Sequence, residues 1–272
     1  MNFGLLIVGD EILSGKREDK HLPKVIELLS ARGLSLSWAR YVGDDPARIT
    51  ADLKDAFGSG DIVFSCGGIG ATPDDHTRQC AAAALGIALE LHPQARDLIL
   101  ERMRDMALER GVPYEPDRDD NRHRLNMGVF PVGAEIIPNP YNKIAGFSVR
   151  HAGASTGAAV HFVPGFPVMA WPMIEWVLDT HYADLHRARG AGERSVIVFG
   201  AMEATLTPLM ESIEARFAGV KVFSLPSVDH PEYGRHIELG VKGHVAALEA
   251  AYAELLVGLK GHDAVLGPEL VR

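Results

Sequence analysis

Short apolar runs alternate with longer helical patterns over the first two thirds of the chain, and this alternation restricts the possible folds more than any other feature. Residues 3–8 and 61–66 are mainly apolar runs, too short for helices and closely followed by glycine, so each predicts a buried strand. Helical spacing begins at Asp19 and again at Pro46, with Asp45 as the expected N-cap. Strands that alternate with helices of ten or more residues form a largely parallel sheet covered on both faces. We therefore expect a three-layer α/β/α domain.

The other elements of this domain follow the same two periodicities. We expect strands at 34–38, 134–137, 147–150 and 159–163, and helices at 76–85, 93–111 and 167–179. Residues 112–120 are rich in proline and aspartate and predict an exposed connection.

A second, smaller unit is expected after a linker. Residues 186–193 are rich in glycine, alanine and charge, which is typical of a connection between domains. The elements expected after it are strands at 196–199, 220–225 and 236–241 and helices at 205–217 and 245–259. We therefore predict a large domain at residues 1–183 and a small α+β domain at residues 193–265.

Charge and composition exclude several classes of protein. The 272 residues include 27 Lys and Arg against 36 Asp and Glu, a net charge of −9, which argues against broad binding to nucleic acid or anionic membranes. Cys66 and Cys80 are the only cysteines and predict two reduced, packed thiols. No stretch approaches the roughly 20 apolar residues that span a bilayer. We expect a soluble, cytoplasmic protein with no nucleic-acid or membrane partner, and homo-oligomerisation stays open.

The glycine-rich sequence CGGIGATPDD at residues 66–75 is the most informative motif. It ends a predicted strand and opens a helix, which is where open α/β sheets bind ligands. Gly67, Gly68 and Gly70 would let the backbone approach a phosphate closely, and the helix N-terminus offers free N–H groups. The spacing matches neither the dinucleotide fingerprint nor a Walker loop. The structural alternative is a tight turn whose aspartates cap the helix.

Acidic residues follow two other predicted strands. Gly9, Asp10 and Glu11 come directly after the first strand, and adjacent carboxylates there can hold a divalent cation or orient a ribose hydroxyl. Asp44 follows the second strand, next to Asp45, which the helix N-cap already explains. Each acidic pair alone is more often structural, as part of a capped turn. Three such strand ends on one edge of a sheet favour a binding site.

Other motifs give weaker signals. The histidines show no metal-binding spacing, and no Gly-x-Ser-x-Gly elbow is present. The basic run at residues 118–124 could reach a phosphate, but a solvated, salt-bridged face is the commoner role of such a run.

These motifs resemble a known family. The sequences GDEILSG at residues 9–15, VGDD at 42–45 and GGIGATPDDHT at 67–77 resemble the amino-terminal domain of the CinA-type competence/damage-inducible family, which has the molybdopterin-cofactor biosynthesis (MoCF) fold. The resemblance continues through PNP at 138–140 and VPGFP at 163–167, and it covers nearly all of residues 3–180. The second unit is similar to the small KH-like domain of this family. The family's carboxy-terminal amidohydrolase domain is not recognised, so nicotinamide-mononucleotide deamidation is not implied.

The resemblance implies roles for particular residues. In the family, the glycine loop with Thr72 cradles phosphate, and Asp44 and Asp75 lie at positions that matter in molybdopterin-binding relatives. The family also includes enzymes that cleave ADP-ribose and related pyrophosphates, where a divalent metal such as Mg²⁺ neutralises the pyrophosphate and water attacks. This implies Glu11 and Asp75 as catalytic residues and Asp10, Glu11 and Asp75 as metal ligands. The implied ligand-binding residues are Gly9, Asp10, Asp44, Gly67, Gly68, Gly70, Thr72, Asp74, Asn139 and Lys143.

The chain departs from the family pattern at three places. NKIAG at residues 142–146 replaces the usual Gly-Thr-Ala-Pro-Gly, and Val168 and Met169 replace a Ser-Glu pair, which removes a carboxylate. Residues 16–21, KREDKH, stand where the family is usually Asn-rich. The lost acid weakens a hydrolytic role, whereas Lys143 with Lys16 and Arg17 favours holding an anionic ligand.

Three hypotheses follow. The first is a metal-dependent hydrolase of nucleotide pyrophosphates such as ADP-ribose or FAD. The second is a non-hydrolytic protein that binds molybdopterin, another pterin or a nucleotide. The third is a regulatory remnant with an architectural pocket. The second unit lacks the GxxG loop that clamps a nucleic-acid backbone, so packing or a subunit interface is its expected role.

Overall fold

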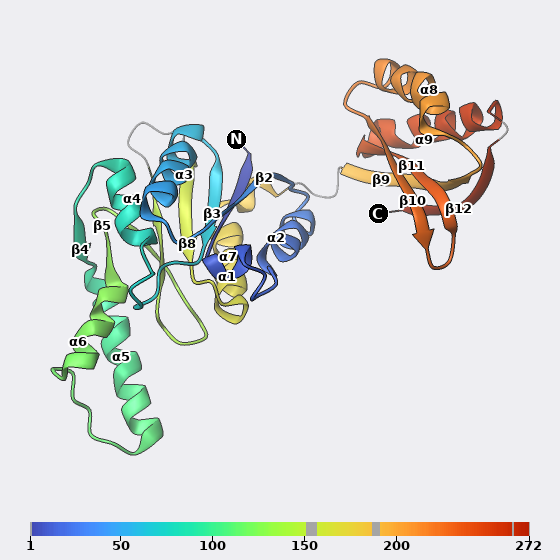
Figure 1. The fold of residues 1–272 in the computed structure, drawn as a ribbon. Helices are drawn as coiled ribbons and strands as arrows, with labels where there is room; N and C mark the ends of the chain where they lie inside the picture. The colour runs from blue at the N-terminus through green and yellow to red at the C-terminus, as the bar shows by residue number, and fades with distance from the viewer. Residues whose placement is uncertain (1, 151–156, 187–190, 263, 272) are drawn as a thin grey trace. The chain divides into compact units, whose positions relative to one another are not determined.

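A computed structural model describes residues 2–150, 157–186, 191–262 and 264–271, arranged in two compact units, Met1–His186 and Arg187–Arg272 (Figure 1). The boundary falls inside the predicted linker at 186–193, of which residues 187–190 lie outside the described part. The last three residues of that linker prediction belong instead to strand β9 (Ala191–Phe199), because they pair with the neighbouring strand β11 (Gly234–His244).

The first unit is built on a six-stranded, mostly parallel sheet. Its strands, in spatial order, are β2 (Leu36–Val42), β1 (Phe3–Val8), β3 (Ile62–Cys66), β8 (Ala159–Val163), β7 (Gly146–Val149) and β6 (Glu135–Ile137). The first four are parallel to one another, whereas β7 and β6 are antiparallel to their neighbours. Every residue of β1, β3, β7 and β8 is buried, as expected for strands covered on both faces.

Helices cover both faces of this sheet, which confirms the predicted three layers (Figure 1). The helices concerned are α2 (His21–Ser30), α7 (Pro167–His181), α3 (Pro46–Ser59) and α4 (Thr77–Leu85). The apolar residues of α2 and α7 share one buried core with Leu5 and Phe64 of the sheet. Those of α3 and α4 share a second core with Leu6 and Val63. Neighbouring residues of one strand thus point into opposite cores, because successive side chains of a strand lie on opposite faces of the sheet.

Several short elements were not expected from the sequence. They are α1 (Asp10–Leu13), β4 (Leu89–Leu91), α6 (Asp119–Leu125), a 3₁₀ turn at Asn126–Gly128, β5 (Val129–Pro131) and a 3₁₀ turn at Ala183–Leu185. Helix α5 (Pro93–Arg110) was expected and is long. Together α5 and α6 extend beyond the sheet, and we call residues 93–125 the α5–α6 arm (Figure 1).

The start of α3 tests the predicted cap. Asp45 precedes Pro46, and its Oδ1 accepts a hydrogen bond of 2.8 Å from the Arg48 amide. Because the cap satisfies an otherwise free N–H, Asp45→Ala should lower the free energy of unfolding by about 1 kcal/mol. Asp45→Asn keeps an acceptor oxygen and should stay within a few tenths of the wild type. Urea unfolding followed by fluorescence measures both, and equal losses in the two variants would contradict a role for the cap.

A buried chain of polar groups joins β7, β8 and the end of α7. The Tyr182 hydroxyl donates to the Gly157 carbonyl at 2.9 Å and contacts His161 Nε2 at 2.7 Å. Its single proton is therefore committed, so His161 Nε2 is the donor to Tyr182. His161 Nδ1 is then an acceptor, which receives the Ser148 hydroxyl at 2.7 Å. Both ring nitrogens of this fully buried, neutral histidine are satisfied.

The second unit is an antiparallel α+β fold, as predicted for its class. Its four strands, in spatial order, are β10 (Lys221–His230), β11, β9 and β12 (Val265–Val271). Helices α8 (Glu203–Arg216) and α9 (Val245–Lys260) share a core with the sheet through residues such as Leu206, Ile213 and Leu255. Strand β12 was not expected. The resemblance of this unit to a KH-like domain stays a prediction.

The cysteines and the lengths of the helices bear on two further predictions. Cys66 and Cys80 are both free and buried, as predicted for packed thiols. None of the helices in the described ranges combines the length and the apolar character needed to cross a lipid bilayer.

Candidate functional site

The carboxyl ends of the parallel strands surround a cleft of about 730 Å³. Its walls come from the loops after β1, β2, β3 and β8 and from the α5–α6 arm. Two of the acidic strand ends meet directly, because the Asp10 amide donates to Asp44 Oδ2 at 3.0 Å and the Asp44 amide donates to Asp10 Oδ1 at 3.2 Å. The three strand-end motifs found in the sequence therefore lie at one edge of the sheet, as open α/β topology requires.

The glycine loop is held by the first residues of α4. The Gly67 carbonyl accepts from the Thr77 hydroxyl at 3.1 Å, and the Gly68 carbonyl accepts from the Thr77 amide at 3.0 Å. The Ile69 carbonyl accepts from the guanidinium of Arg78. Three consecutive carbonyls are thus directed at the start of α4.

The orientation of these carbonyls determines that of the next amides. In a trans peptide the C=O of one residue and the N–H of the following residue point in opposite directions. The amides of Gly68, Ile69 and Gly70 therefore point away from α4, and all three residues line the cleft. None of the described residues accepts a hydrogen bond from these amides. Consecutive free N–H groups of this kind form an anion-binding concavity.

Glycine is required at two positions of this loop. Gly67 has φ 106° and Gly68 has φ 68°, both in the left-handed region. A Cβ on Gly67 would collide with the Val8 carbonyl oxygen, and one on Gly68 would collide with the Thr77 hydroxyl. The close packing of the loop against β1 and α4 explains the glycine pair.

The acids around the loop are largely engaged in organising it. Asp75 Oδ2 accepts from the Thr72 amide at 2.8 Å and from its hydroxyl at 2.5 Å, which closes the turn that leads into α4. Burial raises the pKa of Asp44, although the hydrogen bond from the Asp10 amide opposes this rise. The negative charges of Asp10, Glu11 and Asp74 raise it further. These carboxylates are therefore close enough to repel one another.

The donor set of the cleft does not favour a metal ion. In the described part of the chain, no three His, Cys, Asp or Glu side chains come together as a group that could hold a metal ion. Of the predicted ligands, Asp10 and Asp75 each accept hydrogen bonds from neighbouring backbone amides. The predicted ligands, as the described residues arrange them, therefore do not form a ready metal centre.

Most of the predicted site residues line the cleft, and three do not. Those in its wall are Gly9, Glu11, Asp44, Gly67, Gly68, Gly70, Thr72, Asp74 and Asp75. Asp10 is exposed and does not line the cleft, and its Oδ1 accepts a hydrogen bond from the Asp44 amide. Asn139 is buried and organises its own loop, because its Nδ2 donates to Asn142 Oδ1 at 2.8 Å and to the Ile144 carbonyl at 2.9 Å.

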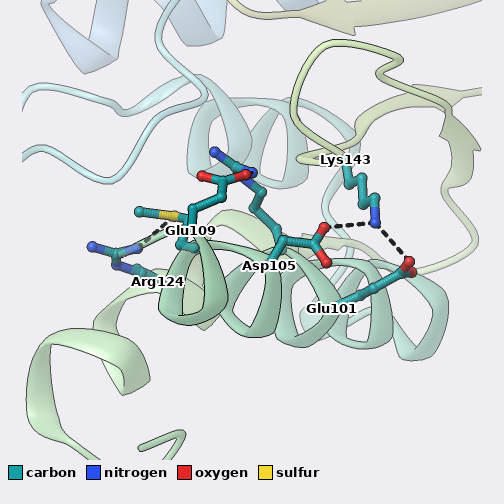
Figure 2. A network of polar contacts seen from close by, with 7 residues as sticks. Glu101, Asp105, Glu109, Arg124 and Lys143 are labelled. Carbon is teal, nitrogen blue, oxygen red and sulfur yellow. Dashed lines mark hydrogen bonds and ion pairs between the residues drawn. The ribbon is translucent and has the colours of Figure 1, made fainter. Parts of the chain in front are cut away.

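Lys143 also lies outside the cleft wall. Its ammonium contacts Glu101 at 2.7 Å and Asp105 at 2.6 Å, both on α5 (Figure 2). These two acids raise the pKa of Lys143, which is also the only non-glycine residue with positive φ in the described ranges. Lys143 thus forms a clamp between the loop at 139–146 and the arm, which we call the Lys143 clamp.

The arm supplies residues that the sequence did not single out. Ile99, Arg102, Met103 and Met106 of α5 all line the cleft, and their spacing of three and four places them on one face of the helix. This spacing was visible in the sequence, but nothing there showed that the face meets the glycine loop. Arg17 and Arg124, which the sequence offered as possible anion-binding residues, also line the cleft, as do Asn142 and Met169 of the altered motifs. Other lining residues that the sequence did not single out are Met127, Tyr141 and Phe166.

Cations balance the acids of the cleft. Arg17 lies 4.0 Å from Glu11 and its guanidinium is 5.7 Å from the Phe166 ring centre. Arg102 pairs with Glu109 at 2.8 Å, and Arg124 Nη1 contacts Met106 Sδ at 3.3 Å. Figure 2 shows Arg124 beside α5, the helix that carries Glu101 and Asp105 of the Lys143 clamp.

Comparison with known proteins identifies related sequences. The family model described as "Probable molybdopterin binding domain" matches residues 4–183. A CinA-like protein of Anaeromyxobacter dehalogenans is 33% identical over 269 residues, which cover 97% of this chain and 60% of that protein. The chain thus spans about 60% of the length of this relative. A protein of Pyrobaculum aerophilum is 28% identical, with 94% of this chain and 92% of its own length covered.

A solved structure shares the fold. The crystal structure of CinA from Thermoplasma acidophilum, a protein described as having unknown function, superposes with a TM-score of 0.53 at 24% identity. The match covers 66% of this chain and 98% of that one. This likeness supports the fold of the first unit.

Proposed function

Since this chain belongs to the family of probable molybdopterin-binding domains, we propose that its cleft binds a small phosphate-bearing ligand of the pterin or nucleotide type without hydrolysing it. The observation that carries this proposal is the set of three free amides at Gly68, Ile69 and Gly70. A phosphate placed there would receive three backbone hydrogen bonds near the N-terminus of α4, whose dipole favours an anion.

The size and charge of the cleft agree with such a ligand. Its volume of about 730 Å³ lies within the range of roughly 300–1,000 Å³ found for small-molecule sites. Arg17, Arg102 and Arg124 line it and can approach phosphate oxygens that the loop amides leave free. Lys143, in contrast to these arginines, does not line the cleft.

The loss of an acid supports binding rather than hydrolysis. Met169 stands where the family resemblance implies a carboxylate, and its Sδ accepts a hydrogen bond of 3.2 Å from Asn142 Nδ2. Asn142 belongs to the other altered motif, so two departures from the family pattern contact each other in the cleft wall. Neither side chain can act as a general base at neutral pH.

Metal-dependent hydrolysis of a nucleotide pyrophosphate is the second candidate. One observation favours it, namely the mutual repulsion of Asp44 with Asp10, Glu11 and Asp74, which a divalent cation would relieve. In that case Glu11 and Asp75 remain the proposed catalytic carboxylates. Incubation with ADP-ribose or FAD, with and without Mg²⁺, separates the candidates. Metal-dependent release of AMP would establish hydrolysis, and binding without AMP release supports the binding role.

Thr77→Val tests the glycine loop directly. Thr77 is fully buried and valine has nearly its shape, so the variant should fold but lose the hydrogen bond to the Gly67 carbonyl. Without this bond the peptide that carries the Gly68 amide is no longer held in one orientation. We therefore expect the affinity for inorganic pyrophosphate to fall about tenfold, equivalent to about 1.4 kcal/mol. Isothermal titration calorimetry measures this affinity.

Thr50→Val is the matched control. The Thr50 hydroxyl also donates to a backbone carbonyl, that of Pro46 in α3, but Thr50 does not line the cleft. It should bind pyrophosphate like the wild type. Absence of pyrophosphate binding in the wild type, or equal affinity in both variants, would refute the proposed role of the loop.

A further inference from the structure

Methionines from separate segments line the cleft. Four of the eight methionines in the chain, Met103, Met106, Met127 and Met169, line it, and we call this set the methionine wall. They come from three separate segments, α5, the turn at Asn126–Gly128 and α7. Met103 is buried, whereas the other three are half-buried and present part of their side chains to the cleft.

A phosphate group alone would make no favourable contact with the methionine wall. Phosphate is bound by amides and guanidinium groups, which lie in the loop and beside the wall, whereas the wall itself offers thioethers. When a ligand covers half-buried apolar side chains in a concave surface, their removal from water lowers the free energy of the complex. Thioether sulfur is polarisable and contacts aromatic rings favourably, often at the ring edge. The wall therefore fits the flat, apolar part of a ligand.

Polar contacts hold the wall in position. Methionine has three rotatable side-chain bonds and is usually adaptable. Here Met106 Sδ is contacted by Arg124 Nη1 at 3.3 Å, and Met169 Sδ accepts from Asn142 Nδ2 at 3.2 Å. The Lys143 clamp ties α5 to the loop that carries Asn142 (Figure 2). A surface arranged in this way before binding loses little entropy when a ring is bound.

We propose that the methionine wall binds the heteroaromatic ring of the ligand, while the glycine loop holds its phosphate. This inference rests on the proposed function, because it divides the same cleft into a ring half and an anion half. It adds Met106 and Met127 as residues that determine specificity. A ligand with phosphate but no ring, such as a sugar phosphate, would use only half of the cleft.

Probes that carry only one of the two groups test the division. Adenosine and neopterin have a ring without phosphate, and inorganic pyrophosphate has phosphate without a ring. At least one ring probe should bind the wild-type chain in calorimetry or saturation-transfer NMR. Met106→Ala and Met127→Ala should each weaken that binding by roughly three- to tenfold, because a thioether contact is lost. Met127→Ala, which removes no contact with an arginine, should leave pyrophosphate affinity within twofold.

Met202→Ala is the matched control. Met202 lies in the second unit and is 66% exposed, so the same substitution there should change neither affinity. Unchanged thermal melting of the two wall variants shows that they fold. Failure of both ring probes to bind, or equal binding by the wall variants and the wild type, would overturn the ring subsite.

The two proposals fail separately. If pyrophosphate does not bind the wild type but a ring probe binds and depends on Met106, the phosphate role of the loop is wrong and the ring subsite stands. If pyrophosphate binding depends on Thr77 and no ring probe binds, the proposed function stands and the ring subsite is wrong.

Discussion

Replacement of Gly67 by alanine is expected to lower the free energy of unfolding of the first unit by roughly 2–5 kcal/mol. The φ of 106° is unfavourable for any residue with a Cβ, which costs about 1–2 kcal/mol. The new Cβ would also collide with the Val8 carbonyl oxygen and lie 3.3 Å from the Val8 carbonyl carbon, and overpacking of this kind costs roughly 1–3 kcal/mol. Both atoms belong to the backbone of β1, which cannot move aside without breaking its pairing with β2 and β3.

Gly86→Ala separates the two contributions. Gly86 ends α4 with φ 67°, but a Cβ there would meet nothing within 4 Å. This variant should therefore show only the conformational cost, about 1–2 kcal/mol. All three tryptophans, Trp38, Trp171 and Trp176, lie in the first unit, so urea unfolding followed by tryptophan fluorescence reports on this unit. A Gly67→Ala loss no larger than that of Gly86→Ala would contradict the proposed collision.

The second large effect is acid destabilisation through His161. Burial lowers the pKa of His161 to about 3, and the neighbouring charges of His181 and Arg150 add to this. In the unfolded chain its pKa is near the ordinary value of about 6.5. Below pH 6.5 the unfolded state therefore binds a proton that the folded state refuses, and stability falls as the pH decreases towards 3. At pH 5 the loss from this residue should be about 2 kcal/mol relative to neutral pH.

His161→Gln tests this prediction. Glutamine keeps a donor and an acceptor for Tyr182 and Ser148 but does not titrate, so the variant should be less stable at pH 7 and lose less on acidification. Unfolding free energies of variant and wild type at pH 7, 6 and 5 give the difference. His262→Gln, at an exposed position, is the control for the loss of a histidine as such, and its unfolding free energy should depend on pH as that of the wild type does. Parallel pH dependence in His161→Gln and the wild type would contradict the assignment.

The architecture of the first unit could be predicted because its strongest signals are local. The all-buried pattern of β1 and the Asp45–Pro46 start of α3 depend on neighbouring residues, and both agree with the structure. Strand β12 could not be predicted in this way. It contains Gly267 and Pro268, which disfavour strands, and it is extended because it pairs with β9.

The site was predictable where it follows from topology and not where it depends on tertiary contacts. The glycine loop and Asp44 meet because parallel strands place their carboxyl ends at one edge. Lys143 was expected at the ligand because of its charge, yet its partners Glu101 and Asp105 come from a helix about 40 residues earlier. Only the packing of α5 against the loop at 139–146 shows that this lysine is already paired and that Met106 faces the cleft.

The pairing of β3 with β8 has a consequence for folding kinetics. Ile62 pairs with Ala159 across roughly one hundred intervening residues, whereas β1, β2 and β3 follow one another closely, and contacts of high sequence separation form slowly. The Gly67 amide donates to the Val163 carbonyl at the end of β8 at 3.0 Å, and Gly165 and Phe166 follow β8 and line the cleft, so the glycine loop and these residues are all in place only after β8 has docked. A ligand that touches the loop and these residues therefore binds only molecules that have completed this pairing. It should slow unfolding without accelerating folding.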